Sequence, residues 1–165
     1  MKSIGLYAIL AILVGAAAWG YLALKGGAPL PTATPTDPAY THVRIENFVK
    51  VADGLFRGAQ PDQNGYDDLR AIGIRTIACL RVSDDHCEIP QYMAFRTHHI
   101  SFKHIHPEDE DVREFLAILK DKTSRPIYVH CRQGVDRTGM MVAIYRIVVQ
   151  DWTKEAAITE MKQRG

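Results

Sequence analysis

The amino-acid sequence predicts an α/β domain in which a central, mainly parallel β-sheet is flanked by helices. Short apolar runs rich in β-branched residues, such as Ile74–Leu80 and Pro126–His130, are typical of buried strands. Longer segments with apolar residues at helical spacing, such as Pro107–Lys122, alternate with these runs. Strands that alternate with helices in this way are typical of a parallel sheet covered by helices. The N-terminal part of the chain has a different composition and is expected to lie outside this domain.

Residues 1–25 are predicted to form a transmembrane helix that anchors the protein in a membrane. The run from Ile4 to Leu24 has no charged side chain, and a membrane-spanning helix needs about 20 apolar residues. Trp19 and Tyr21 lie near one end of the run, as is common for aromatic residues at a membrane interface. We therefore expect a single-pass membrane protein.

The same segment has an alternative interpretation, and its charges bear on orientation. Ala16 and Ala18 are small enough for a cleavage site, so the alternative is a signal peptide that is removed on secretion. Lys2 and the free amino group precede the apolar run, whereas Lys25 alone follows it. Because positive charge favours the cytoplasmic side, this difference weakly favours a domain that faces the periplasm or the exterior.

Residues 26–40 are rich in Gly, Pro and Thr, which predicts a semi-extended linker rather than a packed element. The globular domain is then expected to comprise residues 41–165. A domain of about 125 residues can bury one modest hydrophobic core.

The domain is expected to begin with two strands, a helix and a third strand. Phe48–Pro61 predicts two short strands around a turn at Asp53-Gly54. Pro61–Ile74 has apolar residues at helical spacing, and Gly73 ends that helix. Ile74–Leu80 follows as a buried strand.

The middle of the domain predicts a helix, a strand and a second helix. The first helix begins after Pro90 and runs towards His99, and Ile100–His106 forms the strand. Pro107–Lys122 begins with a proline and a cluster of acidic residues, both of which favour the first turn of a helix.

The last part of the domain predicts a strand and two helices. Pro126–His130 is the strand, and Arg137–Gln150 is a helix that is apolar nearly all round and should therefore be central. A final helix over Thr153–Gln163 is capped by Asp151 or by Thr153 itself.

The overall charge excludes some classes of partner. The net charge of the chain is +1, so there is no general case for a nucleic-acid partner, and none is expected. Recognition of an anion must therefore depend on a local site.

The three cysteines, Cys79, Cys87 and Cys131, do not match the spacing of a zinc site. Cys79 is most simply a buried small hydrophobe within its strand. An oxidised Cys79–Cys87 pair is compatible with a location outside the cell, but it is not the favoured interpretation.

The segment HCRQGVDRTG, His130–Gly139, has the composition of an anion-binding loop between a strand and a helix. Successive backbone N–H groups in such a loop converge, and the helix N-terminus adds partial positive charge. Gly134 lets the backbone approach its ligand closely. A site of this kind lowers the pKa of a cysteine from about 8.5 to roughly 3.5–7.5, so Cys131 is expected to be a thiolate at neutral pH.

Two further residues of the segment complete this chemistry. The planar fork of Arg137 can bind two phosphate oxygens at once, which a lysine could not do. Thr138 can donate a hydroxyl hydrogen bond to the thiolate of Cys131. Together these groups describe a site in which a sulfur attacks the phosphorus of a bound phosphate.

The segment resembles the His-Cys-x5-Arg-Thr/Ser signature of the cysteine-dependent protein tyrosine phosphatase superfamily. LFRGAQPD, LRAIGIRTIACLR and HPEDEDVREFLAIL are similar to bacterial dual-specificity phosphatases, and the resemblance covers residues 43–163. It implies a phosphotyrosine phosphatase-like fold and a protein-tyrosine or dual-specificity phosphatase activity. It also implies a cysteine nucleophile at Cys131 and a phosphate-binding arginine at Arg137. The residues that would surround the phosphate are His130, Arg132, Gln133, Gly134, Val135, Asp136 and Thr138.

The resemblance further implies a general acid that protonates the leaving oxygen and later activates water. Asp109 is the predicted acid, because related phosphatases carry an Asp three residues before the apolar position filled here by Val112. The neighbouring acidic residues remain alternatives, although such residues also simply favour a helix start. They are Glu108, Glu110 and Asp111, with Asp84 and Asp85 as weaker candidates.

A metal site is a rival interpretation for the histidines of this region. His104 and His106 share a face of the predicted strand, with His98 and His99 nearby. A third ligand is not evident, and a cysteine mechanism needs neither metal nor cofactor. No metal and no cofactor are therefore expected.

The expected substrate is a phosphorylated protein, carrying phosphotyrosine or phosphoserine/threonine, or else a phosphorylated metabolite. The loop lacks the two lysines of some phosphoinositide-cleaving relatives, so a phosphoinositide or inositol phosphate comes second. A catalytically weak module that only binds phosphorylated partners is the alternative from another functional class. Relatives usually continue beyond the last predicted helix, so we expect the domain to be truncated at its C-terminus.

Overall fold

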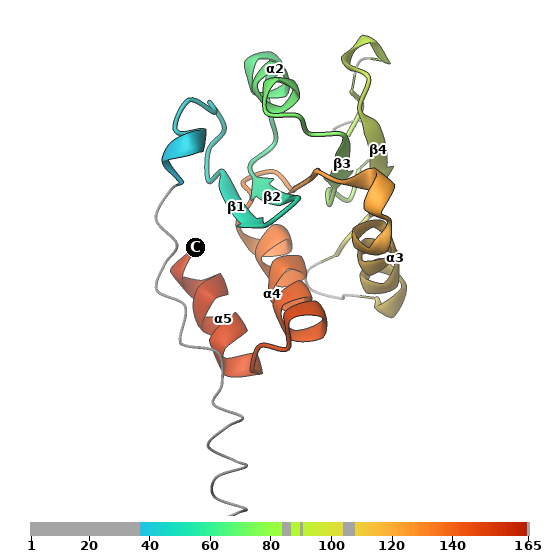
Figure 1. Cartoon of the computed structure of the whole chain (residues 1–165). Helices are drawn as coiled ribbons and strands as arrows, with labels where there is room; N and C mark the ends of the chain where they lie inside the picture. The colour runs from blue at the N-terminus through green and yellow to red at the C-terminus, as the bar shows by residue number, and fades with distance from the viewer. Residues whose placement is uncertain (1–36, 84–86, 90, 104–107, 165) are drawn as a thin grey trace, which may run out of the picture. The chain divides into compact units, whose positions relative to one another are not determined.

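The computed structural model describes residues 37–83, 87–89, 91–103 and 108–164. Their centre is a five-stranded sheet in the order β1-β2-β5-β3-β4 (Figure 1). The strands are β1 (Val49–Ala52), β2 (Leu55–Gly58), β3 (Thr76–Cys79), β4 (Arg96–His99) and β5 (Ile127–His130). β1 and β2 are antiparallel, whereas β2, β5, β3 and β4 are parallel neighbours. The predicted α/β class with a mainly parallel sheet is confirmed.

Helices cover both faces of this sheet (Figure 1). The helices are α2 (Gln63–Ala71), α3 (Asp109–Lys120), α4 (Asp136–Gln150) and α5 (Lys154–Gln163). α3 and α4 pack on one face over Leu55, Ala78 and Val129, and α5 packs alongside α4. α2 and the segment before β1 pack on the other face over Phe56 and Tyr128. Side chains of each strand alternate between two hydrophobic clusters, because successive residues of a strand point to opposite faces.

The region between β3 and α3 differs from the sequence prediction. No α-helix follows Pro90; a single 3-10 turn, η3 (Gln91–Met93), leads into β4. β4 begins at Arg96, whose partner in β3 is Thr76, so the strand lies earlier than the predicted Ile100–His106. Pairing with β3 decided the strand's position, because ladder hydrogen bonds override a weak local propensity. His104 and His106 lie outside the described residues.

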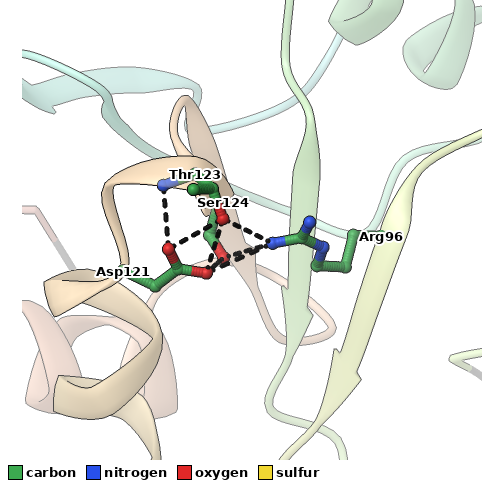
Figure 2. Close-up of polar contacts among 4 residues, drawn as sticks. All are labelled: Arg96, Asp121, Thr123 and Ser124. Carbon is green, nitrogen blue, oxygen red and sulfur yellow. Dashed lines mark hydrogen bonds and ion pairs between the residues drawn. The ribbon is translucent and has the colours of Figure 1, made fainter.

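The start of β4 is fastened to the turn between α3 and β5 by a polar network (Figure 2). Arg96 donates to Asp121 at 3.2 Å and to the Ser124 hydroxyl at 2.9 Å. Asp121 also accepts from the Thr123 backbone N–H at 2.8 Å, which begins the turn η4 (Lys122–Ser124). Hydrogen bonds from the Ser124 hydroxyl and from the hydroxyl and N–H of Thr123, together with the charge of Arg96, lower the pKa of Asp121 to about 2.

The other helices agree with the prediction except at their ends. Asp62 caps α2, and Thr153 caps α5 through its side chain, which decides between the two candidates for the last helix. α4 is central for most of its length, but its C-terminal Val148 and Val149 are exposed. The helix is therefore central as expected, although part of its last turn faces solvent.

The packed domain begins a few residues earlier than predicted. Pro38–Tyr40 forms a 3-10 turn, η1, at the end of the predicted linker. The Tyr40 ring lies edge-on to Phe56, with 5.2 Å between ring centroids. Residues 1–25 lie outside the described residues, and no helix within the described ranges is long and apolar enough to cross a membrane.

Candidate active site

The segment predicted to bind an anion connects β5 to α4. β5 is buried along its length and has parallel strands on both sides. Its carboxyl end therefore lies at the edge of the sheet where α/β proteins bind ligands. The chain makes a short loop after His130 and enters α4 at Asp136. We call residues 131–137 the signature loop.

Gly134 allows the signature loop to lie against the end of β2. Its φ angle is +73°, a conformation that glycine adopts without strain. A Cβ atom at this position would lie 2.2 Å from the backbone carbonyl group of Gly58. Any side chain would thus push the loop away from the sheet. Glycine is therefore needed here for close approach to protein backbone, and the predicted close approach to a ligand stays a prediction.

Cys131 is a reduced cysteine with 3% of its surface exposed. Burial raises its pKa, but hydrogen bonds from Thr138 and from the backbone N–H groups of Gly134 and Gln133 outweigh burial and lower the pKa below its ordinary value. The buried Thr138 hydroxyl has no hydrogen bond of good geometry among the described residues, so it can turn towards the sulfur. The loop therefore favours the thiolate, the nucleophilic form of cysteine.

Arg137 lies in the first turn of α4, at the mouth of the loop. Its Nη1 donates to the Leu80 carbonyl at 3.2 Å, immediately after β3. This contact fixes one edge of the guanidinium. Arg132, Gln133 and Asp136 are exposed around the loop, and Val135 is half-buried. The structure thus brings the predicted phosphate-binding residues together at the end of β5.

His130 is fully buried behind the loop and serves a structural role. Its Nδ1 lies 3.1 Å from the Cys131 carbonyl oxygen, and its ring stacks on Tyr128. Burial lowers the pKa of His130 to about 4, so the imidazole is neutral at pH 7. A neutral ring donates from Nδ1 to that carbonyl and holds the backbone of the nucleophile.

The candidate acids lie at the start of α3. The Asp109 side chain is 94% exposed and lies 3.9 Å from Arg113. Glu110 forms a shorter ion pair with the same arginine, and Glu108 occupies the N-cap without a capping hydrogen bond. Asp111 is half-buried in the same turn. The choice of Asp109 remains a prediction, and Asp84 and Asp85 lie outside the described residues.

The rival interpretation, a metal site formed by histidines, finds no support in the described ranges. Within them, no group of three or more His, Cys, Asp or Glu side chains is placed to hold a metal ion. His99 instead lies with its Nε2 2.6 Å from the Arg81 carbonyl oxygen.

A disulfide joins Cys79 at the end of β3 to Cys87, so the prediction that Cys79 is a simple buried thiol is wrong. Spacing alone could not show that the chain after β3 folds back on itself. The bond closes the loop that follows Leu80 and Arg81. The Leu80 carbonyl accepts from Arg137, so the disulfide lies one residue from a contact of the candidate phosphate-binding arginine.

Sequence reasoning missed three residues that contact the signature loop from behind. They are Asn47, Arg57 and Gln60, all from the segment around β1 and β2. Of the three, only Arg57 could have been singled out from the sequence, because a charged residue within a predicted buried strand needs a hydrogen-bond or ion-pair partner.

Comparisons with known proteins agree with this geometry. A profile of the family described as "DSP-PTPase phosphatase fused to NAD+ Kinase" matches residues 42–165. The dual specificity protein phosphatase TpbA of Pseudomonas aeruginosa UCBPP-PA14 is 30% identical over 148 residues, which cover 84% of the chain and 66% of TpbA. Inositol diphosphatase DSP2 of Oryza sativa subsp. japonica is 25% identical over 132 residues, covering 75% of the chain and 64% of DSP2.

Solved structures show the same fold. The crystal structure of a P. aeruginosa TpbA variant in complex with phosphotyrosine superimposes with a TM-score of 0.65 at 26% identity, covering 79% of this chain and 80% of that chain. The core of the S. cerevisiae PP-IP phosphatase SIW14 gives a TM-score of 0.65 at 20% identity, covering 73% and 76%. The chain spans 66% of the curated TpbA sequence.

Proposed function

Because the chain belongs to the dual-specificity, protein-tyrosine-phosphatase-like family, we propose that it hydrolyses phosphate monoesters through a phosphocysteine intermediate on Cys131. The observation that carries the proposal is the lowered pKa of a buried thiol to which loop N–H groups donate. A thiolate held among donors for an anion is suited to attack phosphorus in a phosphate bound by the same donors.

The reaction proceeds in two steps. The Cys131 sulfur attacks phosphorus, the bond from phosphorus to the leaving oxygen breaks, and the general acid supplies a proton to that oxygen. Water then attacks the phosphocysteine, the acid residue takes a proton from it, and the phosphorus–sulfur bond breaks. Arg137 binds the equatorial oxygens in both steps, and Thr138 stabilises the departing thiolate.

The preferred substrate class is a protein that carries phosphotyrosine or phosphoserine/threonine. A related TpbA structure contains phosphotyrosine, which supports this order. An inositol phosphate is the second candidate, supported by the related inositol diphosphatases. Initial rates on matched phosphotyrosine peptides, phosphoserine peptides, phosphoinositides and inositol phosphates will rank these classes. A binding module without turnover would release no phosphate from any of them.

The anchor remains part of the proposal for the whole protein. We expect the full-length protein to resist extraction from membranes by alkaline carbonate, because residues 1–25 are long and apolar enough to span. N-terminal sequencing that begins after Ala18 would instead indicate a secreted protein.

The nucleophile is tested by Cys131→Ser. A serine hydroxyl keeps the shape of the site but is not ionised at neutral pH, so turnover of an aryl phosphate should fall to background while inorganic phosphate still binds. Arg137→Lys replaces a fork with a point charge and should lower kcat/KM by about 10²–10³-fold. Arg96→Lys, in the distant network of Figure 2, serves as the control and should change neither quantity. Substantial turnover by the serine variant would contradict cysteine catalysis.

The acid is tested by leaving-group dependence. Asp109→Asn should slow hydrolysis of an alkyl phosphate by roughly 10²–10⁴-fold, because a poor leaving group needs the proton. An activated aryl phosphate should show a burst and then a slow phase, and the basic limb of the pH–rate profile should vanish. Glu110→Gln and Asp111→Asn are the matched controls. If one of them removes the basic limb instead, the acid is in this turn but is not Asp109.

A further inference from the structure

The carbonyl groups of the signature loop are held from behind by donors of the N-terminal segment. The Arg132 carbonyl accepts from the Gln60 backbone N–H at 3.1 Å. The Gln133 carbonyl accepts from Asn47 Nδ2 at 3.0 Å, and the Gly134 carbonyl accepts from Arg57 Nη2 at 2.6 Å. Arg57 also reaches the next carbonyl in the chain, that of Val135, at 3.4 Å.

These contacts determine where the N–H groups of the loop point. In a trans peptide unit, the C=O of one residue and the N–H of the next point in opposite directions. A carbonyl drawn backwards at Arg132 therefore turns the Gln133 N–H inwards, and one drawn backwards at Gln133 turns the Gly134 N–H inwards. These are the two loop N–H groups that lower the pKa of Cys131 by donating to its sulfur. The same two peptide units thus accept hydrogen bonds at the rear of the loop through their C=O groups and donate to the sulfur through their N–H groups.

Of the residues that donate to the rear of the loop, Arg57 has the most deeply buried side chain. Its residue is 3% exposed within β2, whereas Asn47 is on the surface. Burial lowers the pKa of Arg57, and the positive charge of Arg164 adds to this effect. Glu160 attracts Arg57, but both of its carboxylate oxygens bind Arg146, at 2.9 and 2.7 Å. Burying a guanidinium costs free energy unless it is hydrogen-bonded. The short hydrogen bond of Arg57 is to the Gly134 carbonyl of the signature loop.

We propose that Arg57 is a positioning residue that holds the Gly134 and Val135 carbonyls away from the phosphate cradle, so that the following N–H groups face the bound phosphate. The charge of Arg57 and the Cys131 thiolate attract each other, so Arg57 also favours the thiolate without touching substrate. Asn47 holds the Gln133 carbonyl in the same way but more weakly, because solvent competes for an exposed hydrogen bond. The proposal rests on the proposed phosphatase function and adds that a residue of β2 orients the phosphate-binding loop.

Other charged groups lie near Arg57 or in the signature loop, and the test variants leave them unchanged. Arg137 and the exposed Asp136 belong to α4, Glu160 belongs to α5, and Arg164 follows α5 as its C-cap. His130 is neutral above about pH 4, because burial lowers its pKa to about 4. Burial raises the pKa of the Tyr128 phenol well above its ordinary value, so it is neutral as well. Arg81 lies near enough to His130 to affect it.

The experiment measures the rate of Cys131 alkylation by iodoacetamide against pH, which reports the thiolate without any substrate. Arg57→Met keeps much of the side-chain volume but removes the charge and the donors. We expect its alkylation midpoint to rise by about one pH unit, a tenfold smaller thiolate fraction below the midpoint. We expect kcat/KM for an aryl phosphate to fall by roughly 10–100-fold, less than the roughly 10²–10³-fold for loss of a donor that itself contacts the anion.

Two further variants separate the effect of the Arg57 charge from that of its hydrogen bonds. Arg57→Lys retains the charge but can reach only one carbonyl, so its midpoint should stay nearer the wild type while kcat/KM still falls about tenfold. Asn47→Asp keeps a side chain that tolerates the φ angle of 55° but cannot donate, and it should have a smaller effect than Arg57→Met. Arg96→Met is the matched control and should leave the midpoint unchanged.

The outcomes separate this inference from the proposed function. A folded Arg57→Met with the wild-type midpoint and kcat/KM would overturn the positioning role, and so would a folded Arg57→Lys with full kcat/KM if the Met variant does not fold. A variant that loses thermal stability but keeps the midpoint would show only a structural role, which also overturns it. A wild-type protein that alkylates as expected but hydrolyses no phosphate ester would instead overturn the proposed function.

Discussion

His130 shows how a single buried side chain couples the nucleophile to the stability of the fold. The residue precedes Cys131, lies fully inside the protein and uses one ring nitrogen to hold the Cys131 carbonyl. The resemblance placed His130 among the residues around the phosphate, whereas its ring lies behind the loop against the Cys131 carbonyl. The motif could not predict that the ring is held neutral, because the cause is burial against strands that are distant in sequence.

The neutral state of His130 predicts an acid-sensitive fold. Its pKa is about 4 in the folded protein and 6.5 ordinarily, so the unfolded chain binds a proton first as the pH falls. The stabilisation is fully present above pH 6.5, is lost as the pH falls towards 4, and amounts to roughly 3 kcal/mol. Urea unfolding of wild type and His130→Asn between pH 7 and 4 measures it. An equal pH dependence in both proteins would contradict this account.

At the scale of elements, α5 is held to α4 by a buried ion pair. Arg146 and Glu160 form two hydrogen bonds, at 2.9 and 2.7 Å, and each side chain is only 8% exposed. The Arg146 guanidinium also lies 4.5 Å from the centroid of the Trp152 ring. The sequence predicted both helices from their periodicity and their cap, but a pair across two helices has no local signal.

Removing one partner of this pair should be costly. Glu160→Ala leaves the Arg146 charge buried without its counter-ion and should lower the free energy of unfolding by roughly 3–5 kcal/mol. Glu110→Ala breaks an exposed pair with Arg113 and should change it by less than about 1 kcal/mol. Chemical denaturation of both variants makes the comparison. Equal losses would mean that the α4–α5 contact is held by packing alone.

Across the whole molecule, the order of most elements and the place of the signature motif could be predicted from sequence. Strand–helix alternation is a local pattern that was confirmed, and the motif lies between β5 and α4 as predicted, whereas the roles of its residues stay predictions. The region between β3 and α3 was not predictable, because β4 is defined by its pairing with β3 rather than by its own residues. The rear of the signature loop was missed for the same reason, since Arg57 precedes Gly134 by 77 residues.

The Cys79–Cys87 disulfide has a practical consequence for anyone who assays this protein. A thiol reagent such as dithiothreitol returns an oxidised Cys131 to its active state, yet the same reagent attacks the half-buried Cys87 and opens the disulfide. The carbonyl of Leu80, one residue beyond Cys79, accepts from Arg137, so opening the disulfide should weaken phosphate binding by Arg137. Activity plotted against reductant concentration should therefore rise and then fall, whereas Cys79→Ser/Cys87→Ser should rise to a lower plateau. A wild-type curve that only rises and levels off would mean that the disulfide does not support the site.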